Sequence, residues 1–229
     1  MKLKKSSVWL LAAMLGFASC SGDKETTYDE LGISPLVAGP VIVYADQTTD
    51  TFTIVSVSSW KAEVEGEGVS LDPFNSSKSQ SGTKVESHNC PIFFTANTTG
   101  NVRSSLLKVS NERHTVGRSY LQTYWLNITL PTVAFTGTTS DNSYQGAYFS
   151  KEVAKDSVST QLMFTIYAPE ATLTTDAEWI TPKEQHFSKG LHTVKLDFSA
   201  NEGKEDRKAV YTLTTSNGIS NDITVIQKH

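Results

Sequence analysis

The side chains that most often carry catalysis or bind metals are scattered along this chain. Its five histidines are His88, His114, His186, His192 and His229, and only His186 and His192 lie close in sequence. On a strand these two would share a face but stay far apart, which does not favour a shared metal ion. The sequence contains no nucleophile elbow, no glycine-rich phosphate loop and no His-Glu-x-x-His motif. We therefore expect no enzyme activity, no metal site and no cofactor.

Neighbouring acidic residues, such as Glu205 and Asp206, have the chemistry of the paired carboxylates that hydrolyse glycosidic bonds. The chain contains 24 aspartates and glutamates, so pairs of this kind arise without any catalytic role. We interpret them as solvated surface charges.

Two segments combine aromatic rings with amides and hydroxyls, the groups that a sugar-binding surface needs. A flat ring covers the apolar face of a pyranose, while nearby polar side chains bind its hydroxyls. The segments are residues 120–125 and 142–148. Within them the candidate carbohydrate-binding residues are Tyr124, Trp125, Tyr144 and Tyr148. The alternative is packing in the core or between domains, the commoner role of aromatic residues in strands.

The N-terminal residues have the pattern of a bacterial secretory signal. A basic stretch, residues 1–5, precedes an apolar stretch, residues 8–17, that is too short to span a bilayer permanently. Small residues then precede Cys20, an arrangement that resembles a lipobox. The resemblance implies that residues 1–19 are a lipoprotein signal peptide and that Cys20 is the lipid attachment site, which would hold the protein on a membrane. A plain signal peptide with an incidental cysteine is the alternative.

The expected mature chain is acidic. Removal of residues 1–19, which hold three lysines and no acid, changes the formal net charge from -4 to -7. Residues 20–38 are rich in acids, serine, glycine and threonine, and predict an acidic flexible tether. Because negative charge opposes binding to a phosphate backbone, nucleic acid is not an expected partner.

Two distant segments have the same pattern of residues. Apolar residues alternate up to Ala96 and Ala200, each of which is followed by an asparagine, and an arginine comes six residues after each asparagine. A second alternation follows each arginine. The pattern predicts, twice, a strand, a polar hairpin turn and another strand. In the turns Asn97–Arg103 and Asn201–Arg207, we expect the arginine to brace the backbone by hydrogen bonds to carbonyl groups.

The correspondence extends to both sides of these segments. A lone tryptophan precedes each copy, Trp60 and Trp179, and a glutamine closes each copy, Gln122 and Gln227. Trp60 lies 15 residues farther from its asparagine than Trp179 does, which predicts an insertion near residues 65–87. A long insertion in a surface loop adds little closure entropy, so it does not argue against the repeat.

The remaining segments alternate apolar and polar residues over short stretches that turn residues separate, as β-strands do. No helical periodicity of useful length lies outside the signal. The side expected to be buried switches near Tyr124 and Trp125, which indicates a bulge or a passage between domains. The sequence therefore predicts an all-β chain of two tandem immunoglobulin-like β-sandwich domains, residues 39–127 and 128–229.

The early tryptophan, the Asn-x5-Arg turn, the alternating apolar residues and a closing Val-x-Gln strand resemble the BACON family (Bacteroidetes-associated carbohydrate-binding often N-terminal). The resemblance covers residues 160–229 well and residues 40–125 loosely. The first copy departs from the pattern by its insertion and by ending in Leu121 and Gln122. The resemblance implies an immunoglobulin-like fold and an association with carbohydrate.

From these observations we expect a non-catalytic lipoprotein of the outer membrane, exposed at the cell surface or facing the periplasm, that binds glycans or assists proteins that process polysaccharides. The expected partners are the membrane, through lipid on Cys20, a polysaccharide or glycan, and other envelope proteins. The alternative is a structural spacer or an adhesion scaffold for proteins, without a sugar site. Fold alone does not decide between them. Two exposed, coplanar rings among the four candidate aromatics would favour binding, and burial of all four would favour the spacer.

Overall fold

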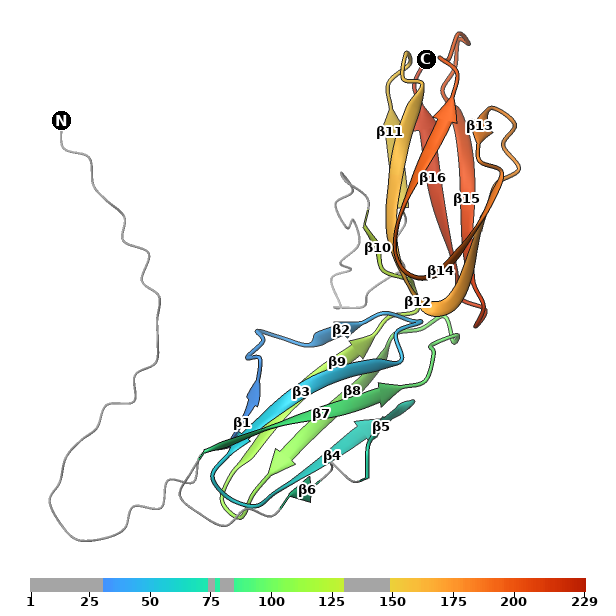
Figure 1. The fold of residues 1–229 in the computed structure, drawn as a ribbon. Coiled ribbons are helices and arrows are strands. Elements are labelled where there is room, and N and C mark those ends of the chain that lie inside the picture. The colour runs from blue at the N-terminus through green and yellow to red at the C-terminus, as the bar shows by residue number, and fades with distance from the viewer. Residues whose placement is uncertain (1–30, 74–76, 79–84, 130–148) are drawn as a thin grey trace, which may run out of the picture.

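The computed structural model describes residues 31–73, 77–78, 85–129 and 149–229 (Figure 1), and these residues form strands and their connections without a helix. Across this described part of the chain, no helix has the length and apolar character that crossing a membrane would require. The predicted signal peptide, Cys20 and the first residues of the predicted tether lie outside the described residues. The all-β prediction is confirmed.

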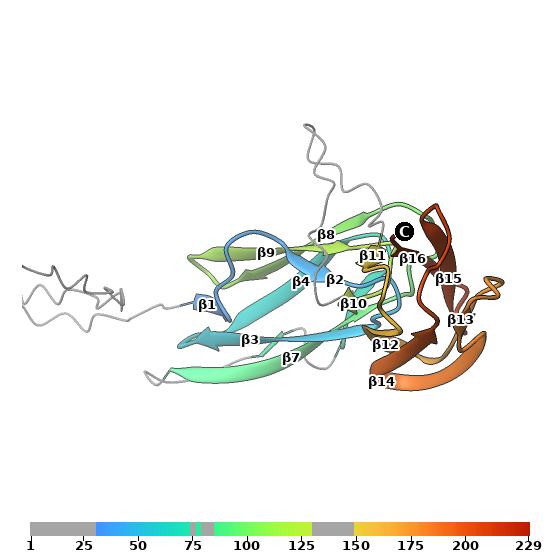
Figure 2. The ribbon, with the colours of Figure 1, turned by 90° about the horizontal axis from the view of Figure 1, so that it is seen from above.

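The strands before residue 123 form a sandwich of two sheets, whose layers are separated in the view of Figure 2. One sheet has the order β1-β3-β7-β5, with β1 at Leu31–Ser34, β3 at Thr49–Ser56, β7 at Glu86–Phe94 and β5 at Val69–Leu71. The other has the order β2-β9-β8-β4-β6, with β2 at Val41–Val43, β9 at Thr115–Gln122, β8 at Arg103–Ser110, β4 at Trp60–Gly66 and β6 at Ser77–Lys78. Alternate residues of the strands face inward, so Phe52, Ile92 and Leu107 meet in one core.

Strand β1 shows that the first sandwich begins earlier than the sequence predicted. Leu31 lies opposite Ser56 in β3, and Ile33 is only 7% exposed in the core. This stretch is therefore a paired strand, although the prediction placed it in the flexible tether of residues 20–38. The strand is only four residues long and contains Gly32, so its alternation is too brief to recognise in the sequence.

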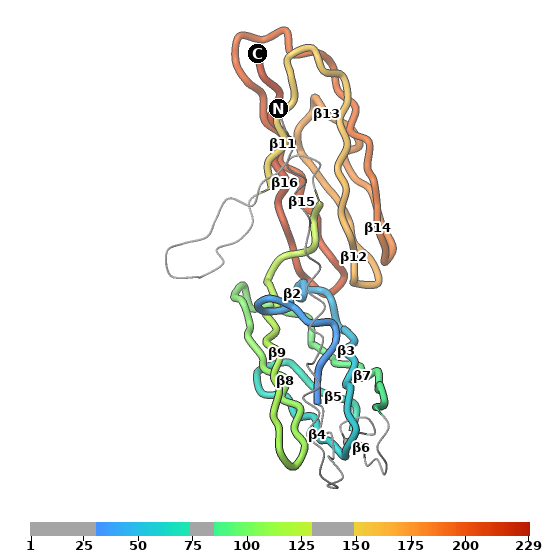
Figure 3. The backbone as a smooth tube through the Cα atoms, turned by 90° about the vertical axis from the view of Figure 1, so that its left-hand side faces the viewer, coloured from blue at the N-terminus to red at the C-terminus, as the bar shows by residue number. Residues whose placement is uncertain are grey.

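The strands from residue 128 onward form the second sandwich, which extends beyond the end of the first (Figure 3). Its strand order is β11-β16-β15-β12-β14-β13, with β10 paired to β12. The strands are β10 at Ile128–Thr129, β11 at Phe149–Val153, β12 at Ser159–Thr174, β13 at Ile180–Thr181, β14 at Glu184–Phe198, β15 at Arg207–Thr215 and β16 at Ser220–Gln227. Their inward residues, among them Leu162, Tyr211 and Val225, are buried in a second core.

Strand β12 serves both layers of the second sandwich. Both halves, Ser159–Ile166 and Glu170–Thr174, pair with β14, and the second half, from Ala171, also pairs with β15. The register with β14 shifts between Ile166 and Glu170, where Pro169 cannot donate a ladder hydrogen bond. In the first sandwich two separate strands correspond to the two halves of β12: β3, which pairs with β7, and β4, which pairs with β8.

The two sandwiches repeat the same strand pairing. Val43 in β2 lies opposite Gln122 in the parallel strand β9, and Val153 in β11 lies opposite Gln227 in the parallel strand β16. The main chain repeats further hydrogen bonds at matching positions: the N–H of Asn97 donates to the carbonyl of Ala45, and that of Asn201 to the carbonyl of Lys155. The internal repeat read from the sequence is thus a structural repeat, and the tandem immunoglobulin-like fold is confirmed.

The repeated polar turn is not a hairpin, and that prediction was wrong. Strands β7 and β8 lie in different sheets of the first sandwich, and β14 and β15 do not pair with each other in the second. The turn instead carries the chain from one layer to the other. Alternating apolar residues occur in both kinds of connection, because either one joins two strands that bury one face, so the sequence pattern did not separate them.

The two lone tryptophans are also not equivalent. In the first sandwich Trp60 is followed by a residue that faces Ser110. The equivalent of Ser110 in the second sandwich is Thr214, which faces Thr172. The residue before Thr172 is Ala171, so an alanine takes the place of Trp60 in the second copy.

The counterpart of the second tryptophan is a glycine. Trp179 precedes the residue that faces Phe198 on β14. In the first sandwich Val69 faces Phe94 on β7, and the residue before Val69 is Gly68. The distance from Gly68 to Asn97 is seven residues longer than the distance from Trp179 to Asn201, so the insertion is seven residues long rather than 15. The additional residues follow β5, in a stretch that lies mostly outside the described residues.

The two tryptophans should therefore differ in their effect on stability. Trp60 is 3% exposed in the first core, so we expect Trp60→Ala to lower the free energy of unfolding by about 3–5 kcal/mol. Trp179 is only partly buried, so we expect Trp179→Ala to cost about 1–2 kcal/mol. Chemical unfolding followed by circular dichroism measures both. Equal losses would contradict the assignment of different positions.

Candidate functional site

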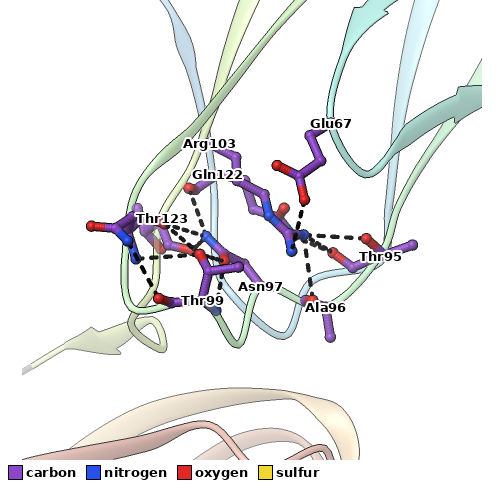
Figure 4. A network of polar contacts seen from close by, with 9 residues as sticks. Glu67, Thr95, Ala96, Asn97, Thr99, Arg103, Gln122 and Thr123 are labelled. Carbon is purple, nitrogen blue, oxygen red and sulfur yellow. Dashed lines mark hydrogen bonds and ion pairs between the residues drawn. The ribbon is translucent and has the colours of Figure 1, made fainter.

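A buried asparagine holds the inter-layer turn of the first sandwich (Figure 4). Asn97 is fully buried, and its Nδ2 donates to the carbonyl oxygens of Asn101 at 2.7 Å, Thr123 at 2.9 Å and Gln122 at 3.3 Å. Its Oδ1 accepts from the backbone N–H of Thr99 at 3.2 Å. One side chain thus joins the turn to the end of β9 by hydrogen bonds to three backbone carbonyls.

The second sandwich contains the same arrangement. Asn201 Nδ2 donates to the carbonyl oxygens of Glu205 at 2.9 Å, Lys228 at 3.0 Å and Gln227 at 3.4 Å. Its Oδ1 accepts from the backbone N–H of Gly203 at 3.1 Å. The asparagine is therefore a structural residue in both copies.

The arginines of the repeated motif brace the same turns, as the sequence predicted. Arg207 donates from Nε and Nη2 to Oε1 of Gln227, at 2.8 and 2.6 Å, and from Nη2 to the carbonyl of Ser199. Its guanidinium also covers the ring of Trp179, with Cζ 4.3 Å from the ring centroid. All of these contacts lie within the second sandwich, so they explain its stability and leave little of Arg207 to bind a ligand.

In the first sandwich the arginine keeps the bonds to Thr95, the equivalent of Ser199, but makes no bond to the closing glutamine. Arg103 Nη1 donates to Oγ1 of Thr95 at 3.2 Å and to its carbonyl at 3.4 Å, and Nη2 lies 4.0 Å from Oε1 of Glu67 (Figure 4). Gly68 allows this approach, because a Cβ there would meet Nη1 at 2.9 Å, and its φ of +69° favours glycine. Arg103 Nε and Gln122 Oε1 are buried without partners among the described residues, so the pair seen in the second copy is not formed.

The junction between the sandwiches contains a buried carboxylate. Asp46 follows β2 and is 0% exposed. Its Oδ2 accepts from the backbone N–H groups of Tyr167 at 2.9 Å and Ala168 at 3.1 Å, which belong to the irregular part of β12. Burial raises the pKa of Asp46, and the hydrogen bonds from Tyr167 and Ala168 lower it in part. Asp46 therefore ties the first sandwich to two backbone donors of the second.

The connection between the sandwiches adds further contacts at the same place. The backbone N–H of Leu126 donates to Oδ1 of Asn221 at 3.1 Å, and that of Thr165 donates to the carbonyl of Asn127 at 2.9 Å. Ala45 and Leu126 are both fully buried in the core of the second sandwich. The two sandwiches thus share apolar contacts as well as hydrogen bonds at their junction.

The four aromatic residues predicted to bind carbohydrate do not share one environment. Trp125 is 7% exposed and lies in the core of the second sandwich, which fits the packing alternative and leaves no open ring face. Tyr124 is partly buried, and its ring meets the Trp125 ring edge-on, at 4.9 Å between centroids and 87° between planes. These two rings are not coplanar. Tyr144 and Tyr148 lie outside the described residues.

The junction brings together another aromatic pair that the sequence analysis did not select. The rings of Tyr44 and Tyr167 are nearly parallel, with centroids 6.0 Å apart and 12° between planes, and both side chains are partly exposed. Burial and the neighbouring Tyr167 raise the pKa of Tyr44. The two residues are 123 positions apart, one just after β2 and the other in β12, so no local pattern in the sequence could have joined them.

The described residues also lack an arrangement of side chains that binds a metal ion. Among the described residues, no group of three or more histidine, cysteine, aspartate and glutamate side chains is arranged to hold a metal ion. The histidines near the junction make local contacts instead, as in the 2.6 Å contact between His192 Nε2 and the carbonyl of Ser188.

Comparison with protein families assigns part of the second sandwich. Residues 169–228 match the BACON family, whose description is "Putative binding domain, N-terminal". This confirms the resemblance for the second copy, from the second half of β12 to the residue after β16. Comparison with curated proteins gave no match.

Several solved structures are similar to this chain, at low scores. A Bacteroides ovatus GH5 xyloglucanase in complex with a heptasaccharide is 20% identical, with a TM-score of 0.32, over 35% of this chain and 17% of that chain. An endo-fucoidan hydrolase from glycoside hydrolase family 107 is 10% identical, with a TM-score of 0.28, over 83% of this chain and 28% of that chain. A chimeric titin Z1Z2 is 12% identical, with a TM-score of 0.31, over 87% of this chain and 96% of that chain. The chain thus spans less than a third of either hydrolase.

Substitution of Asp46 tests the junction. Asp46→Ala leaves two N–H groups without an acceptor, so we expect a loss of about 1–3 kcal/mol for each that stays buried. Asp46→Asn keeps an accepting oxygen and removes the buried charge, so its stability at neutral pH should stay closer to wild type.

The same variants test the pH dependence. Because the folded pKa is above the ordinary value of 3.8, this group makes the protein more stable below that value, and the gain is lost as the pH rises through the raised pKa. Denaturant unfolding over this pH range measures the slope. Asp46→Asn should lack this contribution, and an unchanged slope in that variant would contradict the assignment.

Proposed function

We propose that this protein is a non-catalytic envelope lipoprotein that associates with carbohydrate. The observation that carries the proposal is the match of residues 169–228 to a family described as a binding domain. Two of the similar structures, a xyloglucanase in complex with a heptasaccharide and an endo-fucoidan hydrolase, are of proteins that act on polysaccharides. In this role the protein binds a glycan and thereby assists proteins that process polysaccharides, and it needs no catalytic residues of its own.

The path of the chain supports presentation away from a membrane. Leu31, the first described residue, lies opposite Ser56, whereas Thr49 at the other end of β3 is close to the junction loop. The chain therefore enters the first sandwich at the end distant from the second sandwich (Figure 1). A lipid on Cys20 would place the second sandwich farthest from the outer membrane, facing the glycans of the cell surface or the periplasm.

A structural spacer is the second candidate function. The observations that favour it are the burial of Trp125 and the hydrogen bonds that Asp46 accepts from Tyr167 and Ala168, which join the two sandwiches. A joined pair holds its outer end at a fixed distance from the anchor, whether or not it binds sugar.

Affinity electrophoresis against plant and mucin polysaccharides separates the two candidates. The protein produced from residue 21 onward, without the predicted signal peptide and Cys20, should be retarded in gels that contain at least one of these polysaccharides. A non-binding protein of similar size and charge on the same gels gives the reference mobility. Unchanged mobility in every gel would contradict the carbohydrate proposal and leave the spacer.

Substitution of the predicted lipid attachment site tests the location. In bacterial cells that process lipoproteins, the wild-type protein should fractionate with membranes and require detergent for release. Cys20→Ala removes the thioether-forming sulfur, so the variant should stay unprocessed or appear in the soluble fraction, without incorporation of labelled fatty acid. Cys90→Ala is the matched control and should behave as wild type. Fatty acid labelling of Cys20→Ala would contradict Cys20 as the attachment site.

A further inference from the structure

The aromatic pair at the junction has the features of a binding surface for sugars. We propose that a glycan contacts the protein on Tyr44 and Tyr167, so that the site is composed by both sandwiches; this inference rests on the proposed function. The two rings are nearly parallel, at 12°, and both are partly exposed. An exposed tyrosine offers a flat apolar face to the C–H groups of a pyranose and a hydroxyl to its polar groups.

The fold itself does not require tyrosines at these positions. By the strand register, the residue equivalent to Tyr44 in the second sandwich is Ala154. The carbonyl of Tyr44 accepts from the backbone N–H of Gln47 at 3.0 Å, and the carbonyl of Ala154 accepts from that of Ser157 at 3.1 Å. Ala154 is exposed. The same loop therefore forms with a methyl group in place of the ring, and the ring of Tyr44 has another role.

The same comparison applies to the second ring. Ser56 in β3 and Ile166 in β12 hold equivalent places opposite β7 and β14, so the equivalent of Tyr167 is Val57. Val57 is 7% exposed, whereas Tyr167 is partly exposed. An aliphatic residue thus suffices where no second sandwich is attached, and the aromatic pair is a particular property of the junction.

The backbone at both tyrosines is held in place before any ligand arrives. The backbone of Tyr44 is fixed by the hydrogen bonds to Gln47, and the N–H of Tyr167 is bound by Asp46 at 2.9 Å. Little conformational entropy would be lost when a sugar covers rings that are already aligned, which favours binding by such a small surface.

The polar groups of this cluster are not used up by the protein. Within the described part of the chain, the hydroxyls of Tyr44 and Tyr167 have no hydrogen-bond partner. Oδ1 of Asp46, which is 0% exposed, also lacks a donor there. The two phenols can bind hydroxyl groups of a sugar directly or through water, both as donors and as acceptors, whereas Oδ1 of Asp46 lies beneath the surface and does not reach a sugar.

The charge of the protein favours a neutral glycan. Its net negative charge opposes binding of an acidic polysaccharide. Tyr44 comes from the first sandwich and Tyr167 from the second, so one sugar chain that lies across the junction contacts both.

Alanine variants test the site in affinity electrophoresis, with the neutral polysaccharide that retards the wild-type protein most. Tyr44→Ala and Tyr167→Ala should each weaken retardation, and the double variant should raise the dissociation constant at least about tenfold. Phe93→Ala is the matched control, because Phe93 is an aromatic residue that is 38% exposed on the first sandwich, and it should bind as wild type. Circular dichroism and thermal unfolding check that each variant is folded.

A second measurement uses the wild-type protein and does not depend on the folding of any variant. Nitration of tyrosines followed by peptide mass spectrometry should show that the bound polysaccharide protects Tyr44 and Tyr167 from modification. Full binding by the folded double variant, or unchanged nitration of both residues with polysaccharide bound, would overturn this site and leave the proposed function intact. Absence of wild-type binding to every polysaccharide would overturn both.

Discussion

The amide of one buried asparagine closes each sandwich, and the rest of each module depends on it. Where the chain crosses from one layer to the other, the Nδ2 of Asn97 or Asn201 binds one carbonyl of the crossing and two carbonyls at the end of the last strand. Each asparagine thus joins the crossing to the last strand. Because an unsatisfied buried carbonyl costs about 1–3 kcal/mol, this amide makes the crossing possible at that position.

The two modules differ in how they surround this common network. In the second, Trp179 lies against Arg207, which bonds to Gln227. In the first, glycine takes the place of the tryptophan, and Arg103 bonds to Thr95, as Arg207 does to Ser199, but not to Gln122. The network of the first sandwich lies beside the other module, as the neighbouring ribbon in Figure 4 shows, whereas that of the second lies at the end away from the junction. A repeated frame thus tolerates different neighbours, provided that the asparagine contacts remain.

Local periodicity was sufficient to predict the strands, the all-β class and the repeat, because a strand with one buried face must alternate. It did not predict the path between the strands. Hairpins and inter-layer crossings have the same flanking pattern, so the turn at Asn97 was assigned to the wrong kind of connection. The rarity of tryptophan made Trp60 and Trp179 appear equivalent, although strand register places them at different points. Contacts across the junction, such as those of Asp46, join residues more than 100 positions apart and leave no local signal.

The difference between the repeated modules and the junction indicates where a ligand can bind. The polar groups of the repeated networks are largely occupied by their own module, and the apolar residues of the repeat fill the cores, so little of the repeat remains to recognise a ligand. The junction differs, because its residues are not fixed by the requirements of a single sandwich. Asp46 and the irregular part of β12 bring two tyrosines into alignment there, and the equivalent positions elsewhere hold Ala154 and Val57. A duplication of a stable module thus creates, at the contact between its copies, a surface that neither copy has alone.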